Sequence, residues 1–267
     1  MTRVLLVNDD GIEAAGLALL ERCAHAVFDE VFVVAPASEQ SGVGMGLTLH
    51  DPMRFTPRGE GRWAVTGTPV DCMITAFSHL LEDRRPDLVL SGVNRGANLG
   101  HDVYYSGTAA GAREGLMRGV PSAALSLAGQ GTYPFDVYDG VVEHLLRWLA
   151  VRPPTPAHML NINIPTPEVS TGAEHELFHG APALRGVQFT RLGDRSYDNQ
   201  LILREDPRGL SYFWIGGEFP EMGDAPGTDC RALRDGYVSI TPVRLDATHH
   251  EAIDEVAQQW NHWTEER

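Results

Sequence analysis

The chain has 267 residues, of which 43% are hydrophobic and 21% are charged, and its formal net charge is -15. These proportions are typical of a globular protein, and the acidic balance argues against a nucleic-acid polymer or an anionic membrane as partner. All 21 basic residues are arginines, which excludes mechanisms built on lysine, such as the Walker phosphate loop or a Schiff base.

The N-terminal segment and the cysteines indicate the compartment. The first apolar run becomes acidic after four residues, which is too short for the core of a signal peptide. No window approaches the roughly 18 apolar residues of a membrane span. Cys23, Cys72 and Cys230 are far apart and form no CxxC pair. We therefore expect a cytoplasmic protein without a membrane partner.

Short apolar runs alternate with helical patterns through the first 165 residues. The runs expected to form buried strands are VLLV (4–7), VFVVA (31–35), LVLS (88–91), SAALSL (122–127) and LNINI (160–164). The expected helices cover 14–27, 71–81, 108–119 and 138–151. This βαβ order predicts an α/β fold with a doubly wound, mostly parallel sheet. Residues 47–55 and 61–67 are expected to add an antiparallel hairpin.

The pattern changes after Pro165. Strand-like runs without intervening helices, around VQFTRLG, NQLILRED and LSYFWIGG, predict a protruding β-hairpin arm. GYVSITPV then returns as a strand, and an amphipathic C-terminal helix follows from 250 to 266. Tyr212, Phe213 and Trp214 on the arm, like Trp260 and Trp263 on the last helix, need burial. They cover either another subunit or the chain's own core.

Polar side chains stand where three of the expected strands end, and the carboxyl ends of such strands are where ligands collect. The residues are Asp9, Asp10, Gln40, Ser41, Asn94 and Asn98. The two carboxylates, a serine hydroxyl and the amide oxygen of Asn94 or Asn98 form an oxygen-only set that suits Mg²⁺, Mn²⁺ or Ca²⁺ better than zinc. The alternative is that one aspartate only caps a helix while Gly11 makes the turn.

A second part of the site is expected at a helix start. Ser106, Gly107 and Thr108 precede a run of small residues, so their amides and hydroxyls are placed to hold a phosphate without a lysine. The alternative is an ordinary N-cap on a tightly packed helix. Thr68 and Asp71 in GTPVDCM repeat this pattern more weakly and could serve only to start the next helix.

Taken in order, these motifs resemble the SurE family, survival-protein nucleotidases that remove phosphate from nucleoside monophosphates with a divalent metal. The segments that carry the resemblance are NDDGIEAAGL, VVAPASEQSGVG, GTPVDC, PDLVLSGVNRGANLGHDVYYSGT, LNINIP, DPRGLSYFWIGG and GYVSITPV. It implies a Rossmann-like fold whose hairpin and C-terminal segment help to build a homodimer or homotetramer.

The resemblance also implies roles for individual residues. Metal ligation falls to Asp9, Asp10, Ser41 and Asn94, which would hold one divalent cation per subunit. Phosphate contacts fall to Ser106, Gly107 and Thr108, with Asn98 lining the pocket. The expected organisation is a metal and nucleotide core over 1–185, an arm and returning strand over 186–245 that serves oligomerisation, and a terminal helix over 246–267.

The expected function is hydrolysis of nucleoside monophosphates by attack of a metal-activated water in line with the leaving ribose oxygen. Either Asp9 or Asp10 could accept the proton of that water. One alternative is a non-catalytic nucleotide sensor on the same fold. Another is a zinc hydrolase that uses HELFH at 175–179, which satisfies the HExxH pattern but has glycines and a proline close by.

Overall fold

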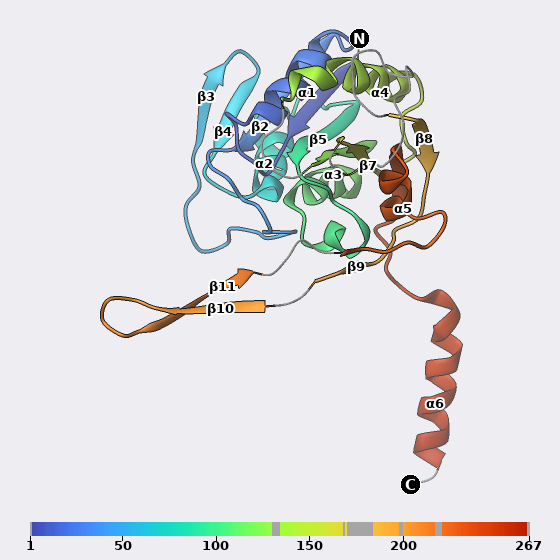
Figure 1. The fold of residues 1–267 in the computed structure, drawn as a ribbon. Coiled ribbons are helices and arrows are strands. Elements are labelled where there is room, and N and C mark those ends of the chain that lie inside the picture. The colour runs from blue at the N-terminus through green and yellow to red at the C-terminus, as the bar shows by residue number, and fades with distance from the viewer. Residues whose placement is uncertain are drawn as a thin grey trace.

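The computed structural model describes residues 2–129, 134–167, 169, 184–197, 200–216 and 221–265. Its centre is a nine-stranded sheet in the order β3-β4-β2-β1-β5-β6-β7-β13-β8 (Figure 1). All neighbouring strands in it are parallel except β3 with β4 and β13 with β7. The sheet strands are β1 (Arg3–Val7), β2 (Glu30–Pro36), β3 (Phe55–Gly59), β4 (Arg62–Val65), β5 (Leu88–Arg95), β6 (Ser122–Ala128), β7 (Met159–Pro165), β8 (Gly186–Phe189) and β13 (Tyr237–Val243).

Helices cover both faces of this sheet. The α-helices are α1 (Ala15–His25), α2 (Pro69–Thr75), α3 (Gly107–Met117), α4 (Asp139–Val151), α5 (Asp229–Arg234) and α6 (Ile253–Glu265). A π-helical stretch at Ala76–Leu80 extends α2, and 3₁₀ turns lie at Gly100–Tyr104, Asp136–Tyr138 and His250–Ala252. The predicted doubly wound α/β fold is therefore confirmed.

Alternation along β1 shows why its short apolar run forms a buried strand. Val4 and Leu6 pack into the cluster that contains residues of α1 and α4, whereas Leu5 and Val7 pack into the cluster around α2. All four side chains are fully buried, because successive strand residues point to opposite faces and both faces are covered. Each such side chain contributes roughly 1.5–3 kcal/mol of transfer free energy.

The expected hairpin near residue 60 is present, but its first strand begins later than the sequence pattern predicts. The prediction of a strand over 47–55 is wrong for most of its length, since β3 begins at Phe55. Thr48 instead bonds to the Asp71 carboxylate, its amide at 3.2 Å and its hydroxyl at 2.6 Å. That bonding ties the 47–54 stretch to the start of α2, and Pro52 has no amide to give to a ladder.

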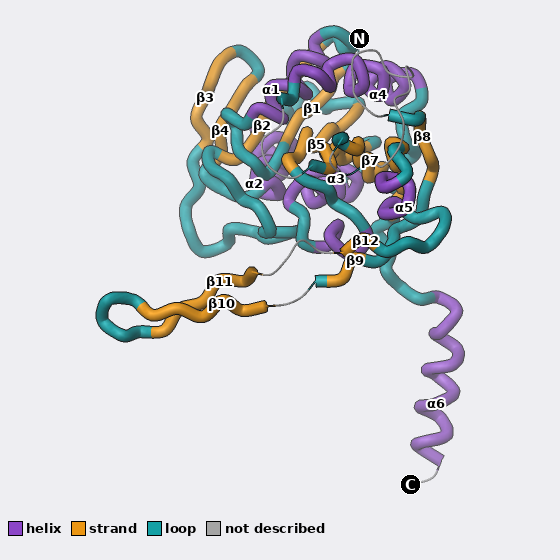
Figure 2. Tube along the Cα trace, in the orientation of Figure 1, coloured by secondary structure: helices purple, strands orange, loops and turns teal. Residues whose placement is uncertain are grey.

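The protruding arm is also present. Strands β10 (Gln200–Glu205) and β11 (Ser211–Gly216) pair antiparallel as a hairpin, and below it β9 (Arg195–Ser196) pairs with β12 (Glu221–Met222). In Figure 2 the hairpin projects from the body while β9 and β12 lie against it. β8 does not belong to the arm, because it pairs with β13 at the edge of the main sheet.

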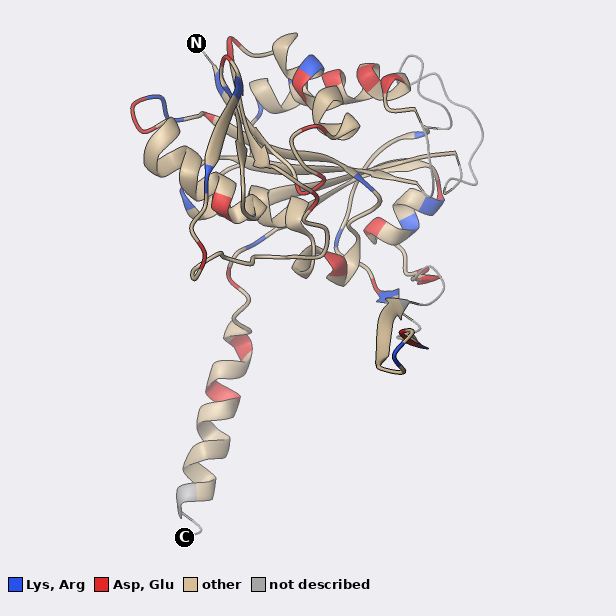
Figure 3. Cartoon of the chain, turned by 90° about the vertical axis from the view of Figure 1, so that its left-hand side faces the viewer, with Lys and Arg blue, Asp and Glu red and all other residues tan. Residues whose placement is uncertain are grey.

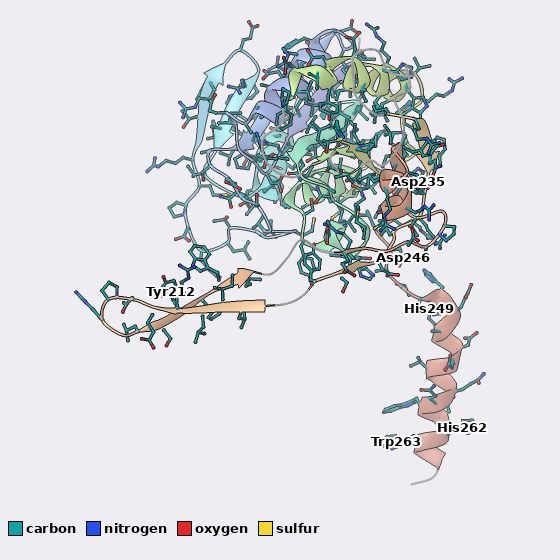
Figure 4. All side chains as sticks on the ribbon, viewed as in Figure 1. Tyr212, Asp235, Asp246, His249, His262 and Trp263 are labelled. Carbon is teal, nitrogen blue, oxygen red and sulfur yellow. The ribbon has the colours of Figure 1, made fainter. Side chains whose placement is uncertain are left out.

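Large apolar side chains are exposed on the hairpin and on α6. Among them, Ile215 is 86% and Trp214 is 63% exposed, and Trp260 on α6 is 62% exposed. Figures 1 and 3, which view the chain from directions 90° apart, both show α6 running away from the body. Figure 4 places Tyr212 on the arm and Trp263 on α6, both away from the core. The structure therefore leaves both elements without the chain's own core to cover them.

Candidate metal and phosphate site

The expected site residues meet at one edge of the sheet. β1 lies between β2 and β5, so the chain order reverses there and a crevice opens at the carboxyl ends of these strands. A pocket of about 400 Å³ lies at this place. Its wall contains five of the eight predicted site residues, namely Asp9, Ser41, Asn94, Asn98 and Ser106.

Asp9 is the most enclosed of the predicted ligands, with 4% of its surface exposed. Its Oδ1 accepts a hydrogen bond from the Thr108 hydroxyl. Its backbone oxygen accepts from the amide of Gln40 at 2.7 Å, which joins the loop after β1 to the loop after β2. Burial raises the pKa of the Asp9 carboxyl, and the hydrogen bond from Thr108 opposes that rise.

Asp10 lies beside this carboxylate. Its Oδ2 accepts from the backbone amide of Arg95 at 3.2 Å, so the first loop also contacts the end of β5. Burial, followed by the charge of Asp9, raises the pKa of Asp10 to about 6. Two neighbouring carboxylates that both resist ionisation form a pair that a positive ion would stabilise.

The other two predicted ligands come from separate loops. The Ser41 hydroxyl donates to Oε1 of Glu39 at 3.0 Å, and Ser41 lies on the pocket wall. Asn94 donates its Nδ2 to the carbonyl of Gly96 at 2.9 Å. This bond occupies the amide nitrogen and leaves the amide oxygen as the end that a cation would take.

A bulge that the sequence did not predict sets the position of Asn94. β5 continues to Arg95, and its register on β6 shifts between Ser91 and Asn94, so Gly92 and Val93 face one residue of the partner strand. Only glycine fits at 92, because its φ is +133° and a Cβ would lie 2.3 Å from the carbonyl oxygen of Leu125. Bulges of this kind turn the following side chains to a new direction.

Asn98 is held by a buried polar network. Its amide donates to Oδ1 of Asn163 at 2.8 Å, and its carbonyl accepts from Nδ2 of Asn163 at 3.0 Å and of Asn161 at 2.7 Å. Its side-chain Nδ2 donates to the Ser126 hydroxyl at 2.9 Å. β6 and β7 therefore fix the part of the third loop that lines the pocket.

The start of α3 supports Asp9 as well as the pocket. Ser106 is the N-cap and accepts from the amide of Ala109 at 2.9 Å. Gly107 lies so close to Asp9 that a Cβ at this position would be 2.7 Å from Cβ of Asp9. Gly107 and Thr108 thus contact the aspartate and are not part of the pocket wall. A phosphate role for these two residues stays a prediction.

Thr68 and Asp71 serve to start a helix, which was the alternative to a second, weaker phosphate site. The Thr68 hydroxyl accepts from the Asp71 amide at 3.1 Å, and the Asp71 carboxylate accepts from the Thr68 amide at 2.9 Å. This reciprocal pair is a capping box at the beginning of α2. With the bonds from Thr48 to Asp71 and from the Thr68 hydroxyl to the carbonyl of Gly46, both side chains are occupied by structural contacts.

Sequence reasoning missed several polar residues on the same pocket wall, among them Asp102, Arg195 and Tyr197. Asp102 lies within PDLVLSGVNRGANLGHDVYYSGT, one of the segments that carry the family resemblance. Nothing in the sequence around Arg195 and Tyr197 connects them to residues some 90 positions earlier. The contacts that join the three side chains appear only in the folded chain.

The HELFH segment at 175–179 lies outside the described residues. Among the residues that are described, no group of three or more His, Cys, Asp or Glu side chains gathers as a metal site. The candidate centre is consistent with this, since serine and asparagine complete its donor set. In the same part of the chain, no helix is long and apolar enough to cross a membrane.

The raised pKa of Asp10 predicts a stability change in metal-free protein. A carboxyl whose pKa is raised in the folded state contributes most to folding stability below its unfolded-state pKa of 3.8. This stability is lost as the pH rises through the folded-state pKa of about 6. Asp10→Asn in EDTA is therefore expected to raise Tm at pH 8 and to have little effect at pH 4. Differential scanning calorimetry at both values measures this.

Asp29 provides the matched control for that experiment. The amide of Thr2 donates to its carboxylate and lowers its pKa, so Asp29→Asn should not raise Tm at pH 8. An equal rise in both variants would indicate relief of the overall negative charge. That result would contradict the prediction that ionisation of Asp10 beside Asp9 destabilises the metal-free protein.

Fold and site together define a doubly wound α/β protein with an oxygen-lined pocket at a strand crossover point. Residues 4–199 match the family described as survival protein SurE. The chain is 45% identical over 262 residues to the 5'-nucleotidase SurE of Gemmatimonas aurantiaca, covering 97% of this chain and 98% of the relative. It is 42% identical over 257 residues to that of Rhodospirillum rubrum, covering 94% of each.

A solved structure agrees with these relatives. The crystal structure of the SurE protein from Aquifex aeolicus superposes with a TM-score of 0.80 at 34% identity, covering 96% of this chain and 99% of that one. The chain belongs to the SurE family.

Proposed function

We propose that the chain is a metal-dependent 5'-nucleotidase that hydrolyses nucleoside monophosphates. The relatives from Gemmatimonas aurantiaca and Rhodospirillum rubrum are named 5'-nucleotidase SurE. One observation supports the proposal most directly. Oxygen-bearing side chains from three strand ends and one helix start, including Asp9, Ser41, Asn94 and Ser106, line a single pocket of about 400 Å³.

The donor set fits one divalent cation per subunit. Asp9, Asp10, Ser41 and Asn94 offer carboxylate, hydroxyl and amide oxygens, which suit Mg²⁺ or Mn²⁺, and Ca²⁺ is compatible with the same ligands. Burial, and after it repulsion from Asp9, raises the pKa of Asp10, and a bound cation would offset both effects. When bound, the ion supplies charge neutralisation at the phosphate and acidifies a water for attack.

The chain's own residues bind and orient the substrate. Ser106, the N-cap of α3, lies on the pocket wall, where the helix dipole favours the negative charge of the phosphate. Contacts from Gly107 and Thr108 to the phosphate are part of the proposal. Asn98 presents its side chain from a loop fixed by Ser126 and Asn163. Either Asp9 or Asp10 accepts the proton of the attacking water. In a protein of net charge -15, this local set has to overcome a repulsive field.

Phosphate release from a panel of nucleotides tests the function. The protein, stripped with EDTA, is expected to be inactive on nucleoside 5'-monophosphates and to regain activity with Mg²⁺ or Mn²⁺. A panel with 3'-monophosphates, measured beside the 5' series, defines the position that is cleaved. Metal content per subunit after reloading, measured by mass spectrometry, is expected to be one ion.

The same panel separates the enzyme from its main alternative. A nucleotide sensor would bind a nucleoside monophosphate in calorimetry and release no phosphate with any ion. Full activity in EDTA after exhaustive dialysis would contradict the role of the cation. Zinc content with casein hydrolysis tests the third alternative, which uses HELFH.

We further propose that the chain forms a homodimer or homotetramer through the hairpin and α6. The exposed Phe213, Trp214 and Trp260 side chains are apolar area that a partner subunit would bury. Light scattering at micromolar concentration is expected to give a multiple of the 29.2 kDa chain. Trp214→Asp should lower that mass, and Arg208→Ala at the hairpin turn should not. A monomeric wild type would contradict the proposal.

A further inference from the structure

The pocket continues beyond the predicted metal ligands toward the base of the arm. There its wall is formed by Arg195, Tyr197 and Met222, together with Leu233 of α5. Arg195 and Met222 face each other as register partners in the β9–β12 pair. This end has an aromatic ring, apolar side chains and one guanidinium, whereas the end at Asp9 has oxygens. The two ends therefore suit different parts of one ligand.

Asp102 holds the polar groups of this second end. Its Oδ2 accepts from Nη1 of Arg195, and its Oδ1 accepts from the Tyr197 hydroxyl. The guanidinium carbon lies 5.8 Å from the centroid of the Tyr197 ring. The Arg195 side chain is 13% exposed and that of Asp102 is 10% exposed. The ring is therefore fixed at its hydroxyl, and about half of Tyr197, 48%, is exposed.

The same contact joins the arm to the phosphate end. The backbone carbonyl of Asp102 accepts from the amides of Tyr105 and Ser106, both at 2.9 Å. Ser106 is the N-cap of α3. Asp102 thus contacts the Tyr197 hydroxyl at one end of the pocket and the start of α3 at the other. These contacts set the distance between the two ends.

Charge decides which part of a ligand belongs at the arm end. The carboxylate of Asp102 neutralises the guanidinium of Arg195, so this pair has no net positive charge to hold a phosphate. Nε of Arg195 is buried and has no hydrogen-bond partner among the described residues. The half-exposed aromatic ring of Tyr197, with Met222 on the same wall, suits a flat heterocycle, and a pocket of about 400 Å³ has room for one.

We propose that Tyr197 stacks on the base of the nucleotide and that Asp102 and Arg195 position its ring, so that these residues set the preference for nucleotides over other phosphomonoesters. This proposal rests on the proposed nucleotidase function, since it names the far end of the same substrate. Tyr197 is the specificity-determining residue, and Asp102 is a positioning residue that acts through it.

The test compares adenosine 5'-monophosphate with ribose 5-phosphate, which has the same phosphate and sugar without the base. Base stacking on an aromatic ring corresponds to roughly a 5- to 150-fold change. Tyr197→Ala is therefore expected to lower kcat/KM for the nucleotide by about that factor and to leave ribose 5-phosphate within about twofold. Tyr197→Phe keeps the ring but loses the bond to Asp102, so its kcat/KM for the nucleotide should fall between those of wild type and Tyr197→Ala, with ribose 5-phosphate again within about twofold.

A binding experiment without metal provides an independent readout. Adenosine, titrated into EDTA-treated wild-type protein by calorimetry, is expected to bind, and binding should be lost in Tyr197→Ala and retained in Tyr197→Phe. Asp102→Asn should raise KM for the nucleotide more than it changes kcat. Tyr197→Ala and Tyr197→Phe should both melt close to wild type, because Tyr197 is 48% exposed, and this confirms that the fold is intact.

The possible failures are distinguishable. If wild-type protein hydrolyses neither substrate with any metal, the proposed function is wrong, while adenosine binding still tests the stacking site. If the enzyme is active and Tyr197→Ala lowers both substrates equally or neither, the base does not lie on Tyr197. Retained adenosine binding in Tyr197→Ala would overturn the inference in the same way.

Discussion

Replacing Asp9 with asparagine is expected to lower kcat/KM for a nucleoside 5'-monophosphate by roughly 100-fold or more. Loss of an outer-shell partner of a metal ligand already costs about 10- to 100-fold, and a direct ligand should cost at least as much. Asp9 is buried, accepts from Thr108 and joins the first two loops through its backbone. Asparagine keeps its shape and removes the charge that would hold the cation.

Phosphate release and calorimetric Mn²⁺ binding measure this effect together. The neutral side chain should not harm the fold, because burial already disfavours the charged form of Asp9. Asp29→Asn, an exposed aspartate outside the pocket, should leave both quantities unchanged. If Asp9→Asn kept nearly full turnover in excess Mg²⁺ or Mn²⁺, this residue would have no part in the reaction.

Adding one methyl group at Gly107 is expected to lower kcat/KM by about 100-fold. The new Cβ would lie 2.7 Å from Cβ and 2.8 Å from Oδ2 of Asp9, so the aspartate or the helix start must move. A displacement of about 1 Å in a catalytic group costs on the order of 100-fold. Alanine is otherwise favourable in a helix relative to glycine, so the loss would come from this contact.

Ala109→Gly is the matched control, since it removes a methyl group two residues further along the same helix. It should lower the free energy of unfolding by about 1 kcal/mol through helix propensity, and further through lost packing because Ala109 is buried. It should leave kcat/KM close to wild type. Far-UV circular dichroism verifies that both variants keep α3. Near-normal activity in Gly107→Ala would show that the spacing between α3 and Asp9 is not critical.

The location of the site was predictable because it depends on local patterns. Short apolar runs such as residues 4–7 identify parallel strands, and the polar residues directly after them must then meet at one edge of the sheet. Asp9, Ser41 and Asn94, far apart in sequence, line one pocket for this reason. The start of α3 at Ser106 was equally visible, since its capping is a short-range interaction.

Other features depend on contacts that no local pattern encodes. The bulge at Gly92 and Val93 follows from the close approach of the Leu125 carbonyl, and β8 joins the sheet only because β13 is available as its partner. The contact of Thr108 with Asp9 could not be separated from ordinary capping by sequence alone. Long-range pairing decides each of these cases.

The short β9–β12 pair connects the hairpin to the pocket, and this has a consequence for concentration dependence. Whatever orders the hairpin also restricts Arg195 and Met222, which lie on the pocket wall. If subunits associate through the hairpin as proposed, a ligand that immobilises these side chains favours that association by the same coupling free energy. Affinity for the nucleotide is thus expected to weaken on dilution, and saturating nucleotide to shift the dissociation midpoint of the assembly downward.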